Sequence, residues 1–119
     1  MRVLVCGGRD FTDAELMENE LNWVTNPVHG GKWSFEMING CARGADTLAL
    51  DWAERHGITV HKFPADWDKH GKRAGYIRNQ QMLDEGKPDL VVAFPGGKGT
   101  AMMIQLAKKA GVKVIEISN

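Results

Sequence analysis

Residues 90–100 read LVVAFPGGKGT. The apolar run Leu90–Phe94 favours a short strand buried on both faces of a parallel sheet. The glycine-rich turn Pro95–Gly99 ends that strand, and a helix is expected from about Thr100. Its apolar face is formed by Met103, Leu106, Ala107 and Ala110, and it ends before Gly111. A strand followed by a turn and a helix is the repeating unit of parallel sheets, because parallel neighbours need a crossover connection.

The same unit recurs along the rest of the chain. Further strands are expected at Arg2–Cys6, Ser34–Asn39, Ile58–Phe63 and Val112–Ile117. Further helices are expected up to about Thr25, from Gly44 or Ala45 to His56, and over Ala74–Glu85. Alternating strands and helices predict a three-layer α/β/α sandwich, with a parallel sheet of about five strands and helices on both faces.

Local signals set the boundaries of these elements. Thr12 and Glu15 have the spacing of a capping box, which predicts that Thr12 starts the first helix. Asn26-Pro27 and Gly30-Gly31 predict the break that follows that helix. The polar stretch Ala65–Lys72 predicts a long loop.

Length and composition limit the possible classes of protein. A chain of 119 residues predicts one domain, 1–119, and 43% hydrophobic with 25% charged residues excludes wholesale disorder. Fifteen basic and fifteen acidic residues give zero net charge, which rules out the basic footprint expected of a general nucleic-acid binder, so nucleic acid is not an expected partner. We expect no membrane span and no signal peptide, and two cysteines favour a reduced, cytoplasmic setting.

Glycine is in excess, at 14 of 119 residues. Three glycine-rich turns each follow a predicted strand and lead into a helix: Gly7–Asp10, Gly40–Asp46 and Pro95–Thr100. Free amides and the positive dipole end at a helix N-terminus favour an anion such as phosphate. Any one turn can instead be only a tight connection, but three at one sheet edge predict a phosphate-bearing ligand. Arg9, Arg43 and Lys98 would supply counter-charge.

Two common phosphate motifs are absent from these turns. Lys98 is followed by Gly99 rather than by a hydroxyl residue, so the P-loop pattern is not matched. Met102 stands where the dinucleotide fingerprint requires its third glycine. Neither a P-loop nucleotidase nor an ordinary dinucleotide dehydrogenase is therefore indicated.

The turns resemble the SLOG superfamily, and the whole chain is similar to its YspA or cpYpsA-related subgroup, also called DUF2493. The matching stretches are Gly7–Asp13, Gly40–Asp46, Phe63–Trp67, His70–Asn79 and Phe94–Thr100. The resemblance implies a Rossmann-like domain of bacteria or phages that binds a nucleotide or nucleotide-sugar, with ADP-ribose-like ligands among the candidates, as a sensor or sequestering module.

The chain also resembles, more distantly, the LOG phosphoribohydrolases, which cleave the base from a nucleoside 5′-monophosphate. Arg78–Met82 and Pro95–Thr100 carry that likeness, but Met103 occupies the place of the catalytic glutamate. A methionine cannot stabilise positive charge on a ribose, so the resemblance leaves an N-glycosidase as the alternative function. There Arg78 would position the ligand, and Asp10 or Asp46 would supply the carboxylate. LOG relatives pair through their outer helices, which implies a possible homodimer or higher oligomer.

The expected site follows from these turns and resemblances. Its ligand-binding residues are Gly7, Gly8, Arg9, Gly40, Arg43, Gly44, Asp46, Arg78, Pro95, Gly96, Gly97, Lys98, Gly99 and Thr100, and its catalytic candidates are Arg78 and Asp10. We expect no metal, because His56, His61 and the cysteines lack ligand spacing, and no cofactor.

Several roles stay open from the sequence alone. Asp46 is favoured as a helix cap over a ligand contact, and Asp10 is equally consistent with a turn residue or a ribose acceptor. Arg78 can point to the crevice or to solvent. Trp67 and His70 can form a stacking lid, or Trp67 can pack on the domain edge. A purely structural or protein-binding domain is a third possible function.

Overall fold

The computed structural model describes residues 1–26 and 35–118. Its strands are β1 (Arg2–Cys6), β2 (Glu36–Asn39), β3 (Val60–Lys62), β4 (Leu90–Ala93) and β5 (Lys113–Glu116). Its helices are α1 (Ala14–Thr25), α2 (Ala45–Arg55), α3 (Trp67–His70), α4 (Ala74–Asp84) and α5 (Lys98–Lys109), with a 3-10 helix, η2 (Gly71–Arg73), between α3 and α4. The predicted break at Asn26-Pro27 and Gly30-Gly31, and the start of the predicted strand at Ser34, fall wholly or partly outside the described residues.

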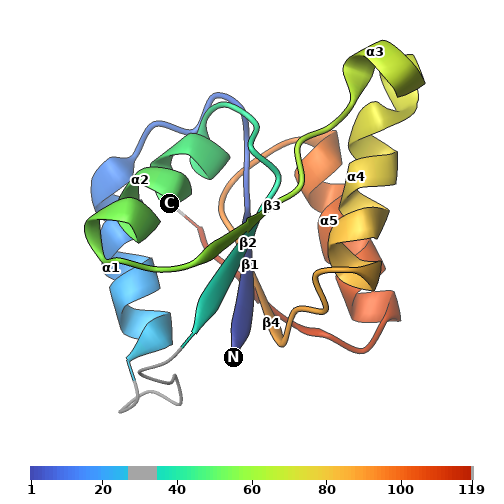
Figure 1. The fold of residues 1–119 in the computed structure, drawn as a ribbon. Coiled ribbons are helices and arrows are strands. Elements are labelled where there is room, and N and C mark those ends of the chain that lie inside the picture. Colours follow the sequence, from blue (N-terminus) through green and yellow to red (C-terminus); the bar gives the residue numbers. More distant parts are fainter. Residues whose placement is uncertain (27–34, 119) are drawn as a thin grey trace.

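The five strands form one parallel sheet in the order β3-β2-β1-β4-β5 (Figure 1). The chain runs outward from β1 to β3, then crosses to β4 and β5 on the other side. Strand order therefore reverses between β1 and β4, which is where open parallel sheets form a ligand crevice beyond the carboxyl ends of the strands. The predicted Rossmann-like three-layer fold is confirmed.

Helices cover both faces of the sheet, α1 and α2 on one side and α4 and α5 on the other (Figure 1). Alternate residues of β1 supply the two cores. Val3 and Val5 pack with Met17 and Leu21 of α1, whereas Leu4 packs in the cluster that covers the opposite face. All four residues of β4 are buried, which confirms that the apolar run at 90–94 is an interior strand.

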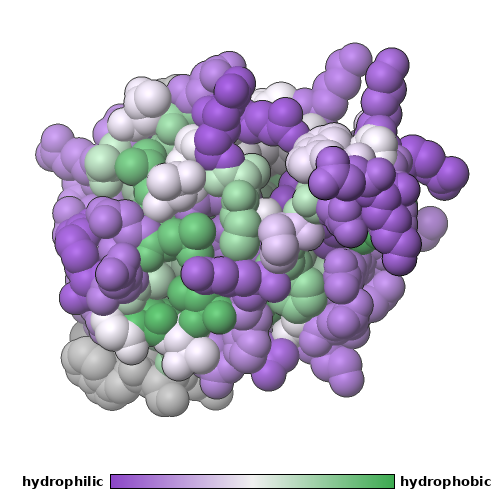
Figure 2. Space-filling model, turned by 45° about the horizontal axis from the view of Figure 1, so that its top comes forward, coloured by the Kyte–Doolittle hydropathy of each residue, from purple (hydrophilic) through white to green (hydrophobic). Residues whose placement is uncertain are grey.

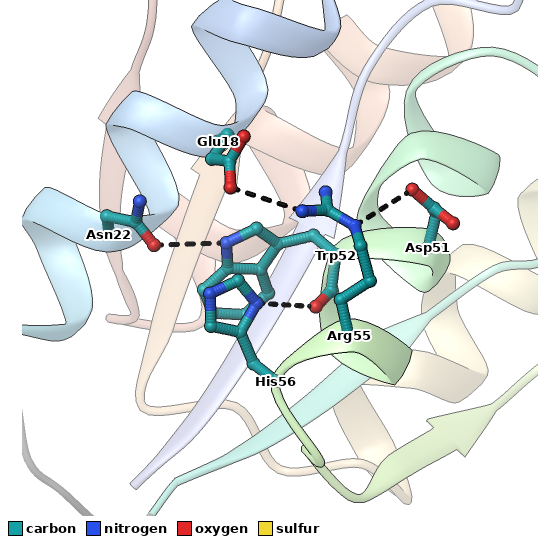
Figure 3. A network of polar contacts seen from close by, with 6 residues as sticks. All are labelled: Glu18, Asn22, Asp51, Trp52, Arg55 and His56. Carbon is teal, nitrogen blue, oxygen red and sulfur yellow. Dashed lines mark hydrogen bonds and ion pairs between the residues drawn. The ribbon is translucent and has the colours of Figure 1, made fainter.

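A buried tryptophan holds α1 against α2 (Figure 3). The indole Nε1 of Trp52 donates to the Asn22 side chain at 3.1 Å, and the His56 ring stacks on Trp52 at 4.4 Å between centroids. Arg55 contacts Glu18 of α1 and Asp51 of its own helix, each at 3.2 Å. These exposed ion pairs add little stability, so burial of Trp52 is the main contribution.

The structure corrects two local predictions. The stretch Ala65–Lys72 is not a loop, because it contains α3 and the start of η2. The side chain of Asp66 accepts from the amide of Lys69 at 3.1 Å and so starts α3. The capping box at Thr12 is also wrong, since Asp13 caps α1 by accepting from the amide of Leu16 at 3.0 Å.

Strand and helix ends differ from prediction by at most two residues, and β1 has the predicted bounds, whereas β3 is confined to three residues. α5 begins at Lys98 rather than at Thr100. Lys98 and Gly99 of the predicted glycine-rich turn therefore belong to the first turn of the helix. Among the described residues, no helix is long and apolar enough to cross a membrane.

Candidate functional site

A cavity of about 380 Å³ opens at the predicted sheet edge, where strand order reverses. Its walls come from four regions: the β1–α1 loop, the start of α2, the segment from α3 to α4, and the start of α5. We call it the site cavity. Its volume lies at the lower end of the roughly 300–1,000 Å³ typical of small-molecule sites. Seen from this edge, the part of the molecule where α3 and the start of α4 project is largely hydrophilic (Figure 2).

The first turn of α5 forms one wall of the site cavity. Gly97 is the N-cap residue and Gly99 lies within the first turn. The first amides of a helix lack intrahelical partners, so those of Lys98, Gly99 and Thr100 are available to a ligand. Thr100 is buried, whereas the side chain of Lys98 is exposed. This wall combines free donors with a positive dipole end and one cation.

Glycines of the β1–α1 loop bring the walls close together. A Cβ on Gly7 would lie 2.6 Å from the Cβ of Ala45, and one on Gly8 would lie 2.9 Å from the carbonyl oxygen of Pro95. The Gly8 amide donates to that same carbonyl at 2.9 Å. Packing of Gly7 against α2 and of Gly8 against the turn after β4 therefore accounts for both glycines without reference to a ligand.

Arg9 and Asp10 follow in this loop and lie at the rim. The Arg9 guanidinium sits 5.2 Å from the centre of the Trp67 ring, a cation–π contact that joins the loop to α3. The carboxylate of Asp10 is almost fully exposed and contacts Arg43 at 3.7 Å. Asp10 thus sits at the mouth of the site cavity rather than on its floor.

Arg78 of α4 points inward. Its Nη1 donates to the carbonyl oxygen of Gly40 at 2.5 Å, and its Nε donates to Asn79 Oδ1 at 3.0 Å. Asn79 in turn donates to the carbonyl oxygen of Gly99 at 3.2 Å. Arg78 and Asn79 therefore tie α4 to the turn after β2 and to the first turn of α5. Burial lowers the pKa of Arg78, as expected for a charge in a partly dry site.

Asp46 lies in the first turn of α2 and is only 7% exposed. Its Oδ2 accepts from the amide of Ala42 at 3.1 Å. Asn39 fixes this turn, because its side chain donates to the Asp46 carbonyl at 3.1 Å and accepts from the Cys41 amide at 2.8 Å. The prediction that Asp46 caps its helix is wrong, because the N-cap residue of α2 is Gly44 and no side chain caps this helix. The carboxylate of Asp46 accepts instead from Ala42, which precedes the helix, and Asp46 lines the site cavity.

Burial raises the pKa of Asp46 to about 6, against opposing effects of the Ala42 amide and the nearby Arg78 charge. In the unfolded chain the pKa returns to near 3.8, so the folded protein binds the proton more tightly. Asp46 therefore favours folding below the unfolded pKa and destabilises the fold as pH rises through about 6.

We expect Asp46→Asn to stabilise the protein without ligand at pH 7.5 by about 2 kcal/mol, because asparagine keeps an acceptor for Ala42 without a buried charge. The gain should shrink to well under about 1 kcal/mol at pH 4, where the folded carboxyl is already protonated. Urea unfolding of both proteins at the two pH values measures this. A stabilisation that is equal at both pH values would contradict the assigned cause.

The structure brings most predicted site residues to one place, but not all of them. Those lining the site cavity are Gly7, Gly8, Arg9, Asp10, Asp46, Arg78, Gly97, Lys98, Gly99 and Thr100. Gly40 and Arg43 line an adjoining pocket that also touches Arg9 and Trp67, and Pro95 and Gly96 line another beside the β1–α1 loop. Gly44 lines none of these three pockets; its φ of +77° and its contacts with the β1–α1 loop give it a structural place.

Sequence reasoning missed several residues of the cavity wall. Tyr76 and Lys72 line it from the segment after α3. Of the two residues predicted as a stacking lid, Trp67 lines the cavity and His70 does not. Asn79 is buried and bridges two walls. The sequence offered one signal for Asn79, namely a polar residue directly after Arg78 in a predicted helix. Met103, at the LOG glutamate place, lines the cavity and is 1% exposed.

Thiol and metal chemistry find little support at this site. Burial raises the pKa of Cys6 to about 12, so its thiol stays protonated at neutral pH. Within residues 1–26 and 35–118, no group of three His, Cys, Asp or Glu side chains is placed to hold a metal ion.

Comparisons with known proteins agree with this fold. The family model for the YspA, cpYpsA-related SLOG family matches residues 1–70. The Gene 61 protein of Mycobacterium phage D29 is 35% identical over 125 residues, which covers 99% of this chain and 97% of that protein. The solved Moco carrier protein from Chlamydomonas reinhardtii has a TM-score of 0.59 at 21% identity, over 98% of this chain and 75% of that one. At 21% identity the structural likeness bears on the fold alone.

Proposed function

Because the chain belongs to the YspA, cpYpsA-related SLOG family, we propose that it binds a small phosphate-bearing ligand, a nucleotide or nucleotide-sugar, in the site cavity. The phosphate lies against the first turn of α5, and Arg78 faces it from α4. The chain acts as a sensor or sequestering module for this ligand.

This proposal rests on the open surroundings of Gly99. A Cβ there would meet nothing within 4 Å, and its φ lies outside the left-handed region, so neither packing nor backbone conformation requires glycine. Glycine inside a helix costs roughly 0.5–1 kcal/mol relative to alanine. The fold gains nothing from this glycine, whereas a ligand that approaches the backbone amides closely would need it. Gly97, at the N-cap, has the same open surroundings.

Gly99→Ala should therefore have opposite effects on folding and on binding. We expect the free energy of unfolding to rise by about 0.5 kcal/mol. We expect the dissociation constant for a nucleoside monophosphate or ADP-ribose to rise about tenfold, because the new methyl group occupies the phosphate position. Urea unfolding measures the first effect and isothermal titration calorimetry the second.

Gln105→Ala is the matched control, since it lies on an exposed part of the same helix away from the site cavity. It should leave binding unchanged. If nucleoside monophosphates, ADP-ribose, NAD and Moco all fail to raise the melting temperature of the wild-type protein at millimolar concentration, the proposed function is wrong.

One observation favours the alternative function, an N-glycosidase: Asp46 and Arg78 line the same cavity. In this alternative, Met103 stands at the place of the catalytic glutamate, and the Asp46 carboxylate stabilises positive charge on the ribose in its stead. Chromatography after prolonged incubation with nucleoside monophosphates would detect free base. If the wild-type protein releases free base and Asp46→Asn does not, hydrolysis is supported. If the wild-type protein releases no free base, the proposed function is binding alone.

Self-association also remains a prediction. It follows from the resemblance to LOG relatives, and sedimentation equilibrium at micromolar concentration tests it.

A further inference from the structure

One oxygen of the Asp46 carboxylate is not used by the protein itself. Oδ2 accepts from the Ala42 amide, and no described residue donates to Oδ1. In the described part of the chain, no buried side-chain nitrogen or oxygen lacks a hydrogen-bond partner. Oδ1 is therefore in contact with solvent, although Asp46 as a whole is only 7% exposed. Since Asp46 lines the site cavity, Oδ1 opens into it.

Arg78 does not neutralise this oxygen by direct contact. Its guanidinium is directed to the Gly40 carbonyl and to Asn79, and no ion pair within 4.0 Å joins it to Asp46 in the described structure. Two further titratable groups face Asp46, the thiols of Cys6 from β1 and Cys41 from the turn after β2, and the Asp46 charge raises the pKa of both. Burial raises the pKa of both thiols, so both are protonated at neutral pH. Above about pH 6 Oδ1 is thus an ionised acceptor without a protein donor, and a hydroxyl group of a ligand can replace the water that donates to it.

The placement of Asp46 relative to α5 suggests which ligand group donates. α2 and α5 cover opposite faces of the sheet, and their first turns reach the same cavity from the two sides of β1. A carboxylate repels phosphate and attracts hydroxyl groups. A ligand with its phosphate at α5 would turn its sugar toward Asp46, within a cavity of about 380 Å³ that suits a single nucleotide.

We propose that Asp46 is a specificity-determining residue: its Oδ1 accepts a hydrogen bond from a ribose hydroxyl of the phosphate-bearing ligand, so the site selects ribonucleotides over deoxyribonucleotides. This inference rests on the proposed function. A buried acceptor strongly disfavours a ligand that lacks the matching hydroxyl, because the acceptor is then left without a partner.

The test compares AMP, 2′-deoxy-AMP and 3′-deoxy-AMP by calorimetry at pH 7.5. The wild-type protein should bind AMP at least about tenfold more tightly than one of the two deoxy analogues. Asp46→Asn, whose fold is expected to be more stable at this pH, should lose most of that preference because a neutral amide is a weaker acceptor. Asp68→Asn is the matched control: it makes the same change on exposed α3, outside the site cavity, and should keep the wild-type preference.

A second measurement uses the wild-type protein alone. The preference for AMP should decrease between pH 7.5 and pH 5, as the Asp46 carboxyl becomes protonated. Equal binding of all three nucleotides by the wild-type protein would overturn the role of Asp46, and so would an unchanged preference in Asp46→Asn. Failure of the wild-type protein to bind any of the three, or any other phosphate-bearing probe, would instead overturn the proposed function.

Discussion

Gly44→Ala should reduce the free energy of unfolding by about 4 kcal/mol, because the new methyl group would meet both a left-handed backbone and closely packed neighbours. Gly44 has φ of +77°, and a Cβ there would lie 2.3 Å from the carbonyl oxygen of Gly8 and 2.5 Å from that of Arg9. Both contacts are with backbone, so neither can move without displacing the β1–α1 loop. Chemical denaturation followed by circular dichroism measures the loss.

Gly57→Ala separates the two causes. Gly57 also has a left-handed conformation, with φ of +65°, but a Cβ there would meet nothing within 4 Å. The change should therefore cost only about 1 kcal/mol, from backbone strain alone. Equal losses in the two variants would show that the contact between the loops after β1 and β2 is not what requires Gly44.

Arg78→Met should raise the dissociation constant for the phosphate-bearing ligand about 100-fold, because a partly buried arginine makes strong, charge-assisted hydrogen bonds. The free energy of unfolding should fall by about 2 kcal/mol, since the Gly40 carbonyl and Asn79 Oδ1 both lose their donor. The pKa of Asp46 should rise further, because the Arg78 charge lowers it in the wild-type protein. Calorimetry, urea unfolding and NMR titration measure these three effects.

Arg73→Met makes the same chemical change five residues earlier. Arg73 is exposed in η2 and does not line the site cavity, so ligand binding should stay within about twofold of the wild-type value. A similar loss of affinity in both variants would indicate general electrostatic attraction rather than a position for Arg78 in the site.

The sheet could be predicted because its strands, turns and helices are each marked by residues close together in the sequence. β1 and β4 are short, mainly apolar runs, each glycine turn directly follows a strand, and helical spacing follows the turn. The order of these elements then leaves few topologies for a parallel sheet. α3 was missed because a helix of four residues is too short to show a period, and only the capping side chain of Asp66 marks it.

The candidate site could be predicted in outline but not in detail. The sequence identifies the glycine turns, but it does not distinguish Gly44, held by contacts with Gly8 and Arg9, from Gly99, which has open space around it. That difference depends on segments far apart in the chain. The inward direction of Arg78 depends in the same way on the Gly40 carbonyl, which α4 reaches only in the folded protein.

The contact between Arg9 and Trp67 has an optical consequence. The Trp67 indole is about half exposed, lines the site cavity and lies 5.2 Å from the Arg9 guanidinium. A molecule entering the cavity would displace water from one side of this ring, which shifts indole emission to shorter wavelength. Trp67→Phe would remove that signal while keeping an aromatic ring beneath Arg9. The protein thus carries an intrinsic fluorophore at the entrance to its cavity, which allows unlabelled ligands to be screened in real time.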